Sequence, residues 1–482
     1  MPLWSYPLLA IAAIFVLLLL VVFIRTLAFR PKKKAARTAA PVTVDAARAT
    51  AELAEMIRCR TVSDTDPARE DAAEFEKFEK LLPTLYPSVF ATCERINVND
   101  RAILLRWRGK SADEASVLMS HYDVVSVEES GWSHAPFAGT VEDGILYGRG
   151  TLDTKVTLAA ALHAAEQLIK TDFVPAHDLY FAFSGNEEIS GGGAPAIVDY
   201  FEQNAITLGA VYDEGGAVVE NVFPGVHVPA AMVGIAEKGM MNIEFSVTAS
   251  GGHASAPPPV TPIGRLSAAC CRVERKPHPM KISEPAAKMF DTLARRSNVG
   301  LRAIFANLWI FRPVLNLICK KSGGEMNALV RTTVAYTQMQ GSKGMNVLPA
   351  KATMLANLRL VQGDTQETVL ARMQHKVKDK NVTLRVINGQ EPSRISRTDV
   401  EAWERISAAI EDTWQGVVVT PYLMVACSDS RHYGRISDRV YRFSAMALSK
   451  AERASIHGND ECIPLATVEK AVEFYTRLIS NS

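Results

Sequence analysis

The stretch Ser-His-Tyr-Asp-Val-Val at residues 120–125 is the first of three motifs that decide the fold of this chain. The others are Gly-Arg-Gly-Thr-Leu-Asp-Thr-Lys at 148–155 and Ser-Gly-Asn-Glu-Glu at 184–188. Each motif supplies a side chain that is a good metal ligand, namely His121, Asp153 or Glu188. Because buried carboxylates without partners are costly to keep charged, the three motifs together predict one metal site.

The segments around these motifs alternate between strand-like and helix-like patterns. We expect strands at 101–107, 115–120, 179–183 and 208–212, and helices at 156–169 and 194–201. Such alternation predicts an α/β sheet with parallel strands, whose functional groups gather at the carboxyl ends of the strands. His121, Glu187, Glu188 and Asp213 all follow or end predicted strands, so we expect them at one edge of the sheet.

The pattern changes near residue 238, where an alternating strand at 241–249 is followed by Gly251-Gly252 and a Pro-rich segment. Further helices and strands up to about residue 392 predict an inserted α+β domain. The catalytic domain would then comprise 44–237 and 393–482. Residues 283–320 are helical and unusually apolar, so they could wall an acyl pocket, cover a subunit interface or lie on a membrane, with core packing as the default.

The first 43 residues differ from the rest. Residues 7–24 carry no charge and approach the ~20 residues that cross a bilayer, with Trp4 and Tyr6 before them. We expect a retained transmembrane anchor at 1–30 and a linker at 31–43. A cleaved signal peptide is the alternative, but the basic residues follow the apolar run instead of preceding it. These bases are Arg25, Arg30, Lys32, Lys33, Lys34 and Arg37.

Charge and cysteine content exclude several classes of protein. Without the six bases of the first 43 residues, 47 basic residues remain against 52 acidic ones, so no nucleic-acid partner is expected. By the positive-inside rule the six bases favour a cytoplasmic location for the rest of the chain, but a single span does not decide on which side of the membrane that part lies. Seven scattered cysteines without a Cys-x-x-Cys pair support neither a disulfide framework nor a cysteine zinc site.

Taken singly, the acidic motifs have ordinary explanations. Asp153 could cap the following helix, the Glu187-Glu188 pair could form a solvated turn, and Asp213 opens a Gly-rich turn sequence. In His121-x-Asp123, the aspartate could accept the second imidazole N–H and orient the ring. Together these motifs would place several negative charges at one edge of the sheet, and two divalent cations would neutralise them.

With a late His457-Gly-x-x-Glu461, the ordered motifs resemble the co-catalytic zinc peptidases, a family that includes carboxypeptidase S, glutamate carboxypeptidase, aminoacylase and succinyl-diaminopimelate desuccinylase. The resemblance spans about residues 45–480. It implies a zinc-exopeptidase-like mixed sheet flanked by helices, an inserted lid and dimerisation domain, and two Zn²⁺ ions per subunit. The implied ligands are a bridging Asp153, with His121 and Asp213 on one ion and Glu188 and His457 on the other.

The same resemblance implies the remaining site residues. Glu187 would be the general base, with Asp123 orienting His121, and His253 would stabilise the oxyanion, in many members from the partner subunit of a homodimer. Asn346 and Arg359 would hold the free carboxylate of the substrate, since an Arg suits bidentate binding. Arg431 matches the carboxypeptidase S and fatty-acyl amino acid hydrolase branch. Without the other motifs, His253 would be a turn residue and Arg359 a solvated one.

The sequence therefore predicts a membrane-anchored dinuclear zinc hydrolase that cleaves an amide bond next to a free carboxylate. The leading hypothesis is a carboxypeptidase acting on short peptides. The alternative is an N-acyl amino acid amidohydrolase, and fatty-acyl substrates would suit the apolar 283–320 stretch and the anchor. A third hypothesis, a noncatalytic binding protein, does not explain why Glu187 is present together with every ligand.

Overall fold

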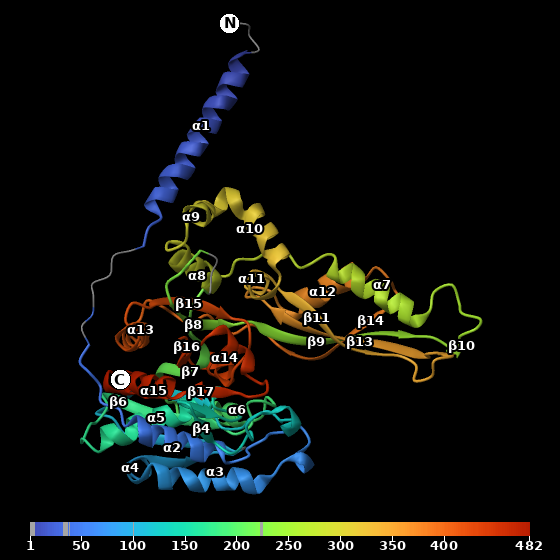
Figure 1. The fold of residues 1–482 in the computed structure, drawn as a ribbon. Coiled ribbons are helices and arrows are strands. Elements are labelled where there is room, and N and C mark those ends of the chain that lie inside the picture. The colour runs from blue at the N-terminus through green and yellow to red at the C-terminus, as the bar shows by residue number, and fades with distance from the viewer. Residues whose placement is uncertain (1–4, 32–36, 38, 100, 222–224) are drawn as a thin grey trace.

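The computed structural model describes residues 5–31, 37, 39–99, 101–221 and 225–482. Trp4 and Lys32, Lys33 and Lys34, on which part of the anchor prediction rests, lie outside the described residues. Figure 1 shows a long N-terminal helix, α1, projecting away from a body that contains a large sheet, its helices and an elongated second sheet.

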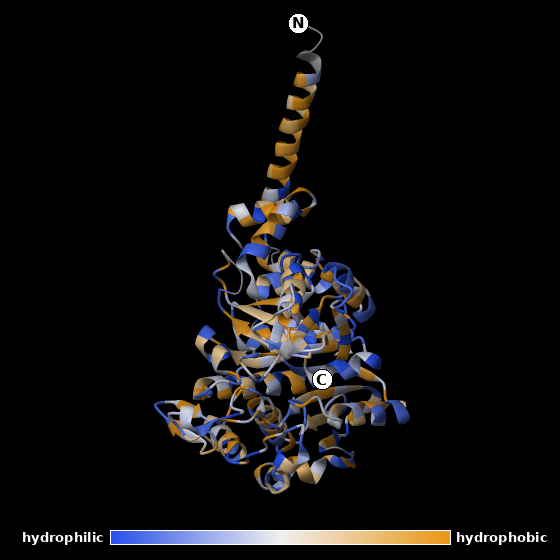
Figure 2. Ribbon diagram, turned by 90° about the vertical axis from the view of Figure 1, so that its right-hand side faces the viewer, coloured by the Kyte–Doolittle hydropathy of each residue, from blue (hydrophilic) through white to orange (hydrophobic). Residues whose placement is uncertain are grey.

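Helix α1, Ser5–Ala28, is the apolar run expected at the N-terminus. Its segment Pro7–Ala28 has 22 residues and contains an 18-residue window with a mean hydropathy of 3.2, and among the described residues no other unbroken helix is long and apolar enough to cross a membrane. Figure 2 shows it as an almost continuous hydrophobic rod outside the body. A signal sequence and a membrane anchor both have this form.

The catalytic domain is built on a mixed sheet of eight strands in the order β1-β2-β6-β3-β7-β16-β8-β15, as far as the described residues go. The central pairs β6–β3, β3–β7 and β7–β16 are parallel, as is β8–β15, while β1–β2 and β2–β6 are antiparallel. The strands are β1 Glu94–Asn97, β2 Ala102–Trp107, β3 Ser111–His121, β6 His177–Ser184, β7 Leu208–Val219, β8 Ala230–Glu237, β15 Val418–Met424 and β16 Val440–Ala447.

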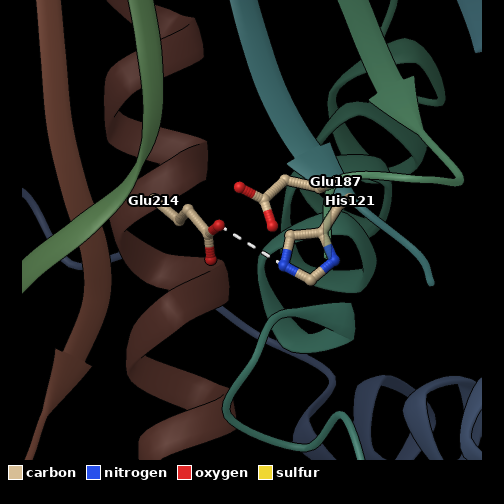
Figure 3. Close-up of side chains that lie close together, drawn as sticks. All are labelled: His121, Glu187 and Glu214. Atoms are coloured by element: carbon tan, nitrogen blue, oxygen red, sulfur yellow. Dashed lines mark ion pairs between the residues drawn. The ribbon is translucent and has the colours of Figure 1, made fainter. Parts of the chain in front are cut away.

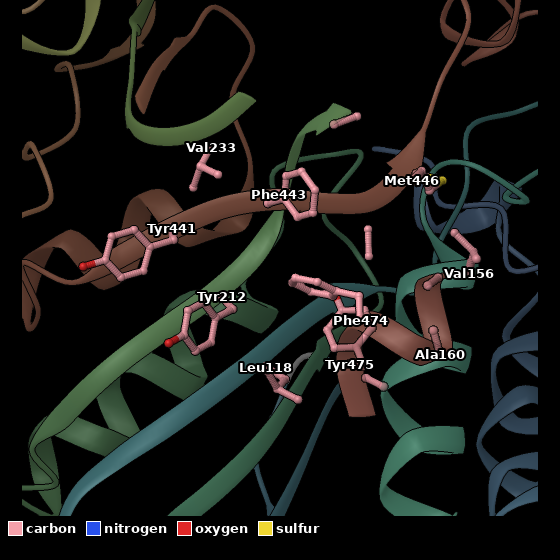
Figure 4. Packing of buried hydrophobic residues seen from close by; sticks show 14 of the residues in the cluster. Leu118, Val156, Ala160, Tyr212, Val233, Tyr441, Phe443, Met446, Phe474 and Tyr475 are labelled. Carbon is pink, nitrogen blue, oxygen red and sulfur yellow. The ribbon is translucent and has the colours of Figure 1, made fainter. Parts of the chain in front are cut away.

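Helices cover both faces of this sheet. One face packs on helices that include α5 and α15, and Figure 4 shows Phe443 and Phe474 among the buried side chains of this core. The opposite face packs on α6 through Tyr180 and Phe201. The helices are α2 Ala46–Ile57, α3 Ala72–Leu85, α4 Pro87–Thr92, α5 Lys155–Ile169, α6 Gly193–Gln203, α13 Glu401–Thr413, α14 Lys450–Ser455 and α15 Leu465–Ser480.

The inserted domain is an antiparallel sheet in the order β11-β13-β9-β14, covered by two helices. Its core is separate from that of the catalytic domain and includes Phe245 and Leu358. A short pair of strands, β10 with β12, forms its outer end in Figure 1. The elements are β9 Gly239–Thr248, β10 Gly252–His253, α7 Pro262–Glu274, β11 Thr333–Gln340, β12 Val347–Leu348, β13 Lys351–Leu360, α12 Gln366–Val377 and β14 Thr383–Gln390.

Four helices lie inside the range 238–392 but pack elsewhere: α8 Glu284–Ala294, α9 Val299–Ala306, α10 Leu308–Ser322 and α11 Gly324–Ala328. Helix α8 packs on β15, and Phe290, Phe305 and Leu315 belong to the core of the catalytic domain. The buried side chains of the 283–320 stretch therefore pack on the catalytic domain, although the stretch lies within the insert in the order of the chain.

Candidate metal centre

Four loops converge at the carboxyl ends of the central strands. His121 ends β3, the Glu187-Glu188 pair follows β6, Asp153 precedes α5, and His457 follows α14. In a parallel region these strand ends share one edge of the sheet, which is why residues far apart in the chain meet there.

Asp153 lies at the centre of the cluster. Its Oδ1 is 3.0 Å from His121 Nε2, and its Oδ2 is 2.9 Å from His457 Nε2. Glu188 Oε1 is 3.2 Å from the same His457 nitrogen. The two oxygens of one carboxylate thus face two different imidazoles, which is the arrangement that a carboxylate bridging two metal ions requires.

The hydrogen bonds of His121 identify the ring nitrogen that faces the acids. Its Nδ1 is 2.9 Å from the Asp123 carbonyl oxygen, which can only accept, so Nδ1 carries the proton of a neutral ring. Nε2 faces Asp153 and Glu214 Oε1, 3.3 Å away (Figure 3). A proton on Nε2 satisfies these acids, and a divalent metal ion bound by the lone pair of the neutral ring would take the place of that proton.

Glu214, and not the neighbouring Asp213, occupies the position beside His121. Consecutive residues of a strand point to opposite sides, so only one of this pair can face the cluster. Asp213 Oδ2 instead accepts hydrogen bonds from Ser428 Oγ at 2.8 Å and from Ser430 N at 3.0 Å. The structure therefore differs from the expectation of Asp213 as a ligand. The sequence motif contains both acids, but the family resemblance assigns the ligand role to Asp213 and none to Glu214.

The electrostatics of the site also fit a cation. Burial raises the pKa of Glu187 well above its ordinary value, and burial raises the pKa of Glu214 to about 8. Burial acts in the same direction on Asp153, but hydrogen bonds with His121 and His457 hold its pKa below the usual range. Removing these carboxylates from water is unfavourable, and bound metal ions would offset that cost.

Asp123, which is fully buried, holds the Glu187-Glu188 turn against β3. Its Oδ1 accepts a hydrogen bond from Glu187 N and its Oδ2 one from Glu188 N, both at 3.1 Å. Ser63 Oγ donates to the same carboxylate at 2.7 Å. The backbone of Asp123 thus orients His121 while its side chain positions the glutamate pair, a second role that the sequence did not predict.

Glu461 ties the Asp153 loop to the His457 loop. Its buried carboxylate accepts hydrogen bonds from Leu152 N at 2.8 Å and Asp153 N at 3.2 Å. Arg149 NH1 lies 2.5 Å from the other oxygen. The sequence motif His457-Gly-x-x-Glu461 predicts no role for its glutamate, and in the structure this carboxylate positions Asp153.

Arg431 lies beside the glutamate pair from a different part of the chain. Its Nη1 is 3.8 Å from Glu187 Oε1 and donates to the Ser428 carbonyl at 2.8 Å. Ser428 is in turn held by Glu237, which is buried and paired with buried Arg442. Sequence reasoning missed this pair because neither residue stands in a recognisable motif.

The remaining predicted site residues lie on the inserted domain. His253 is exposed on β10, and Ala254 N donates to the Asn346 carbonyl at 2.9 Å, so His253 and Asn346 are neighbours at the outer end of the insert. Figure 1 shows that end, at the label β10, well away from β7, which carries Glu214, so this chain does not bring them to its own acidic cluster. Arg359, on β13, donates to Cys427 Sγ at 3.2 Å, close to the Arg431 loop.

Comparisons with known proteins identify the family of this chain. The sequence profile described as Peptidase family M20/M25/M40 matches residues 117–481. The chain is 31% identical over 479 residues to the probable carboxypeptidase S-like 2 of Dictyostelium discoideum, covering 96% of this chain and 92% of that protein. It is 35% identical over 432 residues to the N-fatty-acyl-amino acid synthase/hydrolase PM20D1 of Xenopus tropicalis, covering 88% of this chain and 84% of that protein.

Solved structures show the same fold. The M20 family metallo-carboxypeptidase Sso-CP2 from Sulfolobus solfataricus superposes with a TM-score of 0.64 at 15% identity, over 91% of this chain and 99% of that one. Human carnosine dipeptidase 1 superposes with a TM-score of 0.61 at 13% identity, over 90% and 96% respectively. With a family profile that matches most of the sequence and relatives above 30% identity, the chain belongs to peptidase family M20/M25/M40 and is a metallohydrolase.

Proposed function

We propose that this metallohydrolase uses two zinc ions to cleave an amide bond next to a free carboxylate. The observation that carries the proposal is the central position of Asp153, whose two oxygens face His121 and His457 separately. Glu188 would complete the ligand set on the His457 side, and Glu214 on the His121 side. Asp213, the ligand expected from sequence, would support the Ser428 loop instead.

Zinc ions bound there would polarise the substrate carbonyl and acidify water. Glu187 would take a proton from the attacking water and deliver it to the leaving nitrogen. Its raised pKa suits a group that must hold that proton for part of the cycle. Asp123 would keep Glu187 in place through the backbone, and Arg431 would limit the directions in which its carboxylate can turn.

The substrate carboxylate would be bound by residues of the inserted domain. Arg359 is suited to this role because its guanidinium lies near the Arg431 loop. His253 and Asn346 lie at the far end of the same domain, so they would serve the site of a second subunit in a homodimer. His253 would there stabilise the charge that develops on the carbonyl oxygen.

A carboxypeptidase acting on short peptides is the leading form of this activity, supported by the 31% identity to a probable carboxypeptidase S-like protein over nearly the whole chain. Hydrolysis of N-acyl, including fatty-acyl, amino acids is the second form. It is supported by the 35% identity to an N-fatty-acyl-amino acid synthase/hydrolase and by the apolar helices α9 and α10. Both forms share the free carboxylate and the scissile amide.

The base assignment is tested with Glu187→Gln. The turnover number should fall by about 10²–10⁴-fold, because the proton transfer is lost, while zinc content measured by elemental analysis stays at the wild-type value. Loss of zinc along with activity would show that Glu187 is a ligand and not the base.

The substrate class is tested by measuring hydrolysis of a dipeptide series and of N-acyl amino acids of increasing chain length, with and without chelator. Faster cleavage of dipeptides supports a carboxypeptidase, and rates that rise with acyl length support the second form. Arg359→Ala should raise KM for substrates with a free carboxylate. An equal increase for amidated analogues would contradict the carboxylate-binding role.

The role of His253 across subunits is tested by mixing two inactive variants, His253→Ala and Glu187→Gln. A mixed dimer contains one site with both native residues if His253 acts on the partner's centre, so activity should return on mixing. Absence of activity in dimers that demonstrably contain both variants would reject the arrangement.

We also propose that α1 is retained as a single-pass membrane anchor. The C-terminal end of α1 is built into the body, since the fully buried Asn307 donates through Nδ2 to Val22 O at 3.3 Å and lies 3.4 Å from Thr26 Oγ1. Arg25 Nε donates to the Ala306 carbonyl at 3.1 Å. Cleavage of α1 would expose these groups, so mass spectrometry of the membrane fraction should find the uncleaved N-terminus.

A further inference from the structure

Helices α9 and α10 form a sharp corner at the foot of α1. Their axes differ by 119°, and the break falls at Asn307, whose side chain contacts α1. We call residues 299–322 the α9–α10 corner. Figure 1 shows it at the end of the body from which α1 projects, so any membrane crossed by α1 lies directly against it.

The corner leaves large apolar side chains in the open. Trp309 is 58% exposed, Leu317 55% and Val299 66%, although Leu315 and Phe305 of the same helices are buried in the core. Burying such side chains is favourable, so a surface that exposes several of them marks a site that contacts something apolar. Trp is also the residue that favours the boundary between lipid and water.

Charge identifies the partner. Residues 298–322 contain four basic residues, Arg302, Arg312, Lys320 and Lys321, and no acidic residue. Arg295 stacks on Phe29 and donates to the Arg30 carbonyl, which joins α8 to the foot of α1, while the charge of Arg295 is paired with Asp291 at 2.8 Å. Exposed apolar residues bordered by bases are typical of protein segments that lie in the headgroup region of anionic membranes.

The contacts with α1 set the depth of the corner. Asn307 touches Val22, which lies two residues before Ile24, where the charge-free run ends, and six residues before Ala28, where α1 ends. Two to six residues of α-helix rise ~3–9 Å, which overlaps the ~5–10 Å by which interfacial helices enter the headgroup and acyl boundary. A bilayer that α1 crosses would therefore surround the corner to the same depth.

We propose that the α9–α10 corner is a second membrane contact, seated in the anionic headgroup layer of the bilayer crossed by α1. This contact would hold the catalytic domain against the membrane at a fixed distance, instead of leaving it free on the linker. The inference depends on the anchor being retained, which the mass of the protein checks separately. It does not depend on which amide the enzyme cleaves.

The experiment uses full-length protein in nanodiscs that contain phosphatidylserine and a phosphatidylcholine brominated near the carbonyl end of its chains. Bromine quenches nearby tryptophans. Trp4, which precedes the apolar run, is first removed by Trp4→Phe. In this background bromolipid should lower the fluorescence, and adding Trp309→Phe should abolish most of that loss. Trp132→Phe is the matched control, since Trp132 packs 5.2 Å from Arg149 near the metal centre and its loss should leave the quenching unchanged.

Equal quenching in the Trp4→Phe protein with and without Trp309 would overturn the proposal. Quenching of Trp309 by acrylamide in the aqueous phase then shows what surrounds this side chain instead. Strong quenching by acrylamide would mean that Trp309 is in water, and protection from both quenchers would mean that a second copy of the chain covers it. Activity in the same nanodiscs is measured alongside, so failure of membrane docking is distinguished from failure of the proposed hydrolysis.

Discussion

The buried pair of Glu237 and Arg442 supports the loop that carries Arg431, and its removal yields a prediction of stability. Both side chains are 1% exposed. In Arg442→Met, the Glu237 carboxylate would stay buried with neutral hydrogen bonds from Ser428 N at 3.1 Å and Ser430 Oγ at 3.2 Å, because the single Ser428 hydroxyl proton is donated to Asp213 at 2.8 Å. Leaving one charge of a buried pair uncompensated costs about 3–5 kcal/mol, and these hydrogen bonds place the expected loss near the lower limit, about 3 kcal/mol.

The matched control removes both charges. In the double variant Glu237→Gln/Arg442→Met, the amide oxygen can still accept from Ser428 and Ser430, but no charge is buried. The double variant should therefore lose less unfolding free energy than the sum of the losses measured for Glu237→Gln and Arg442→Met singly, and the difference should be at least about 2 kcal/mol. Urea unfolding in detergent micelles, followed by intrinsic fluorescence and extrapolated to zero urea, measures all four free energies.

Two results would refute this reasoning. A loss below about 1 kcal/mol for Arg442→Met would mean that solvent screens the pair as it screens surface ion pairs. Additive losses in the double variant would mean that the two charges do not interact. If the reasoning holds, Arg442→Met should also lower the turnover number at unchanged zinc content, because the loop that presents Arg431 to Glu187 loses its support.

Three further outcomes are expected. Glu214→Gln should lower the zinc content that elemental analysis measures, whereas Asp213→Asn should keep the zinc and lower the thermal stability. The opposite pattern would identify Asp213 as the ligand. Prolonged dialysis against chelator should abolish turnover, and added Zn²⁺ should restore it; activity in protein shown to be metal-free would exclude metal catalysis. Burial lowers the pKa of His278 to about 4, whereas its pKa in the unfolded chain is ~6.5. Between these two pH values the unfolded chain binds one more proton than the folded protein. The free energy of unfolding therefore falls as the pH drops, by at most about 1.4 kcal/mol per pH unit. His278→Gln should show a shallower loss of unfolding free energy between pH 7 and pH 5; an unchanged slope would show that His278 does not contribute.

Much of the fold could be predicted because local patterns encode it. The helix expected at 156–169 is α5, Lys155–Ile169, and the strand expected at 179–183 is the centre of β6, His177–Ser184. The family resemblance drawn from five ordered motifs is confirmed by the profile match and by the relatives. These features depend on residues close together in the chain, where hydrophobic periodicity and turn residues act directly.

The amino-acid sequence was enough to predict the apolar N-terminal helix, the α/β alternation and the set of acids and histidines near strand ends. It does not show which member of the Asp213-Glu214 pair faces His121, because the pairing of β7 with β16, which is irregular at this point, sets the direction of each side chain. The tertiary structure also joined Glu461 to the Asp153 loop and placed α9 and α10 on the catalytic domain. Such contacts connect residues up to hundreds of positions apart, and their geometry depends on how the whole sheet packs rather than on any local pattern.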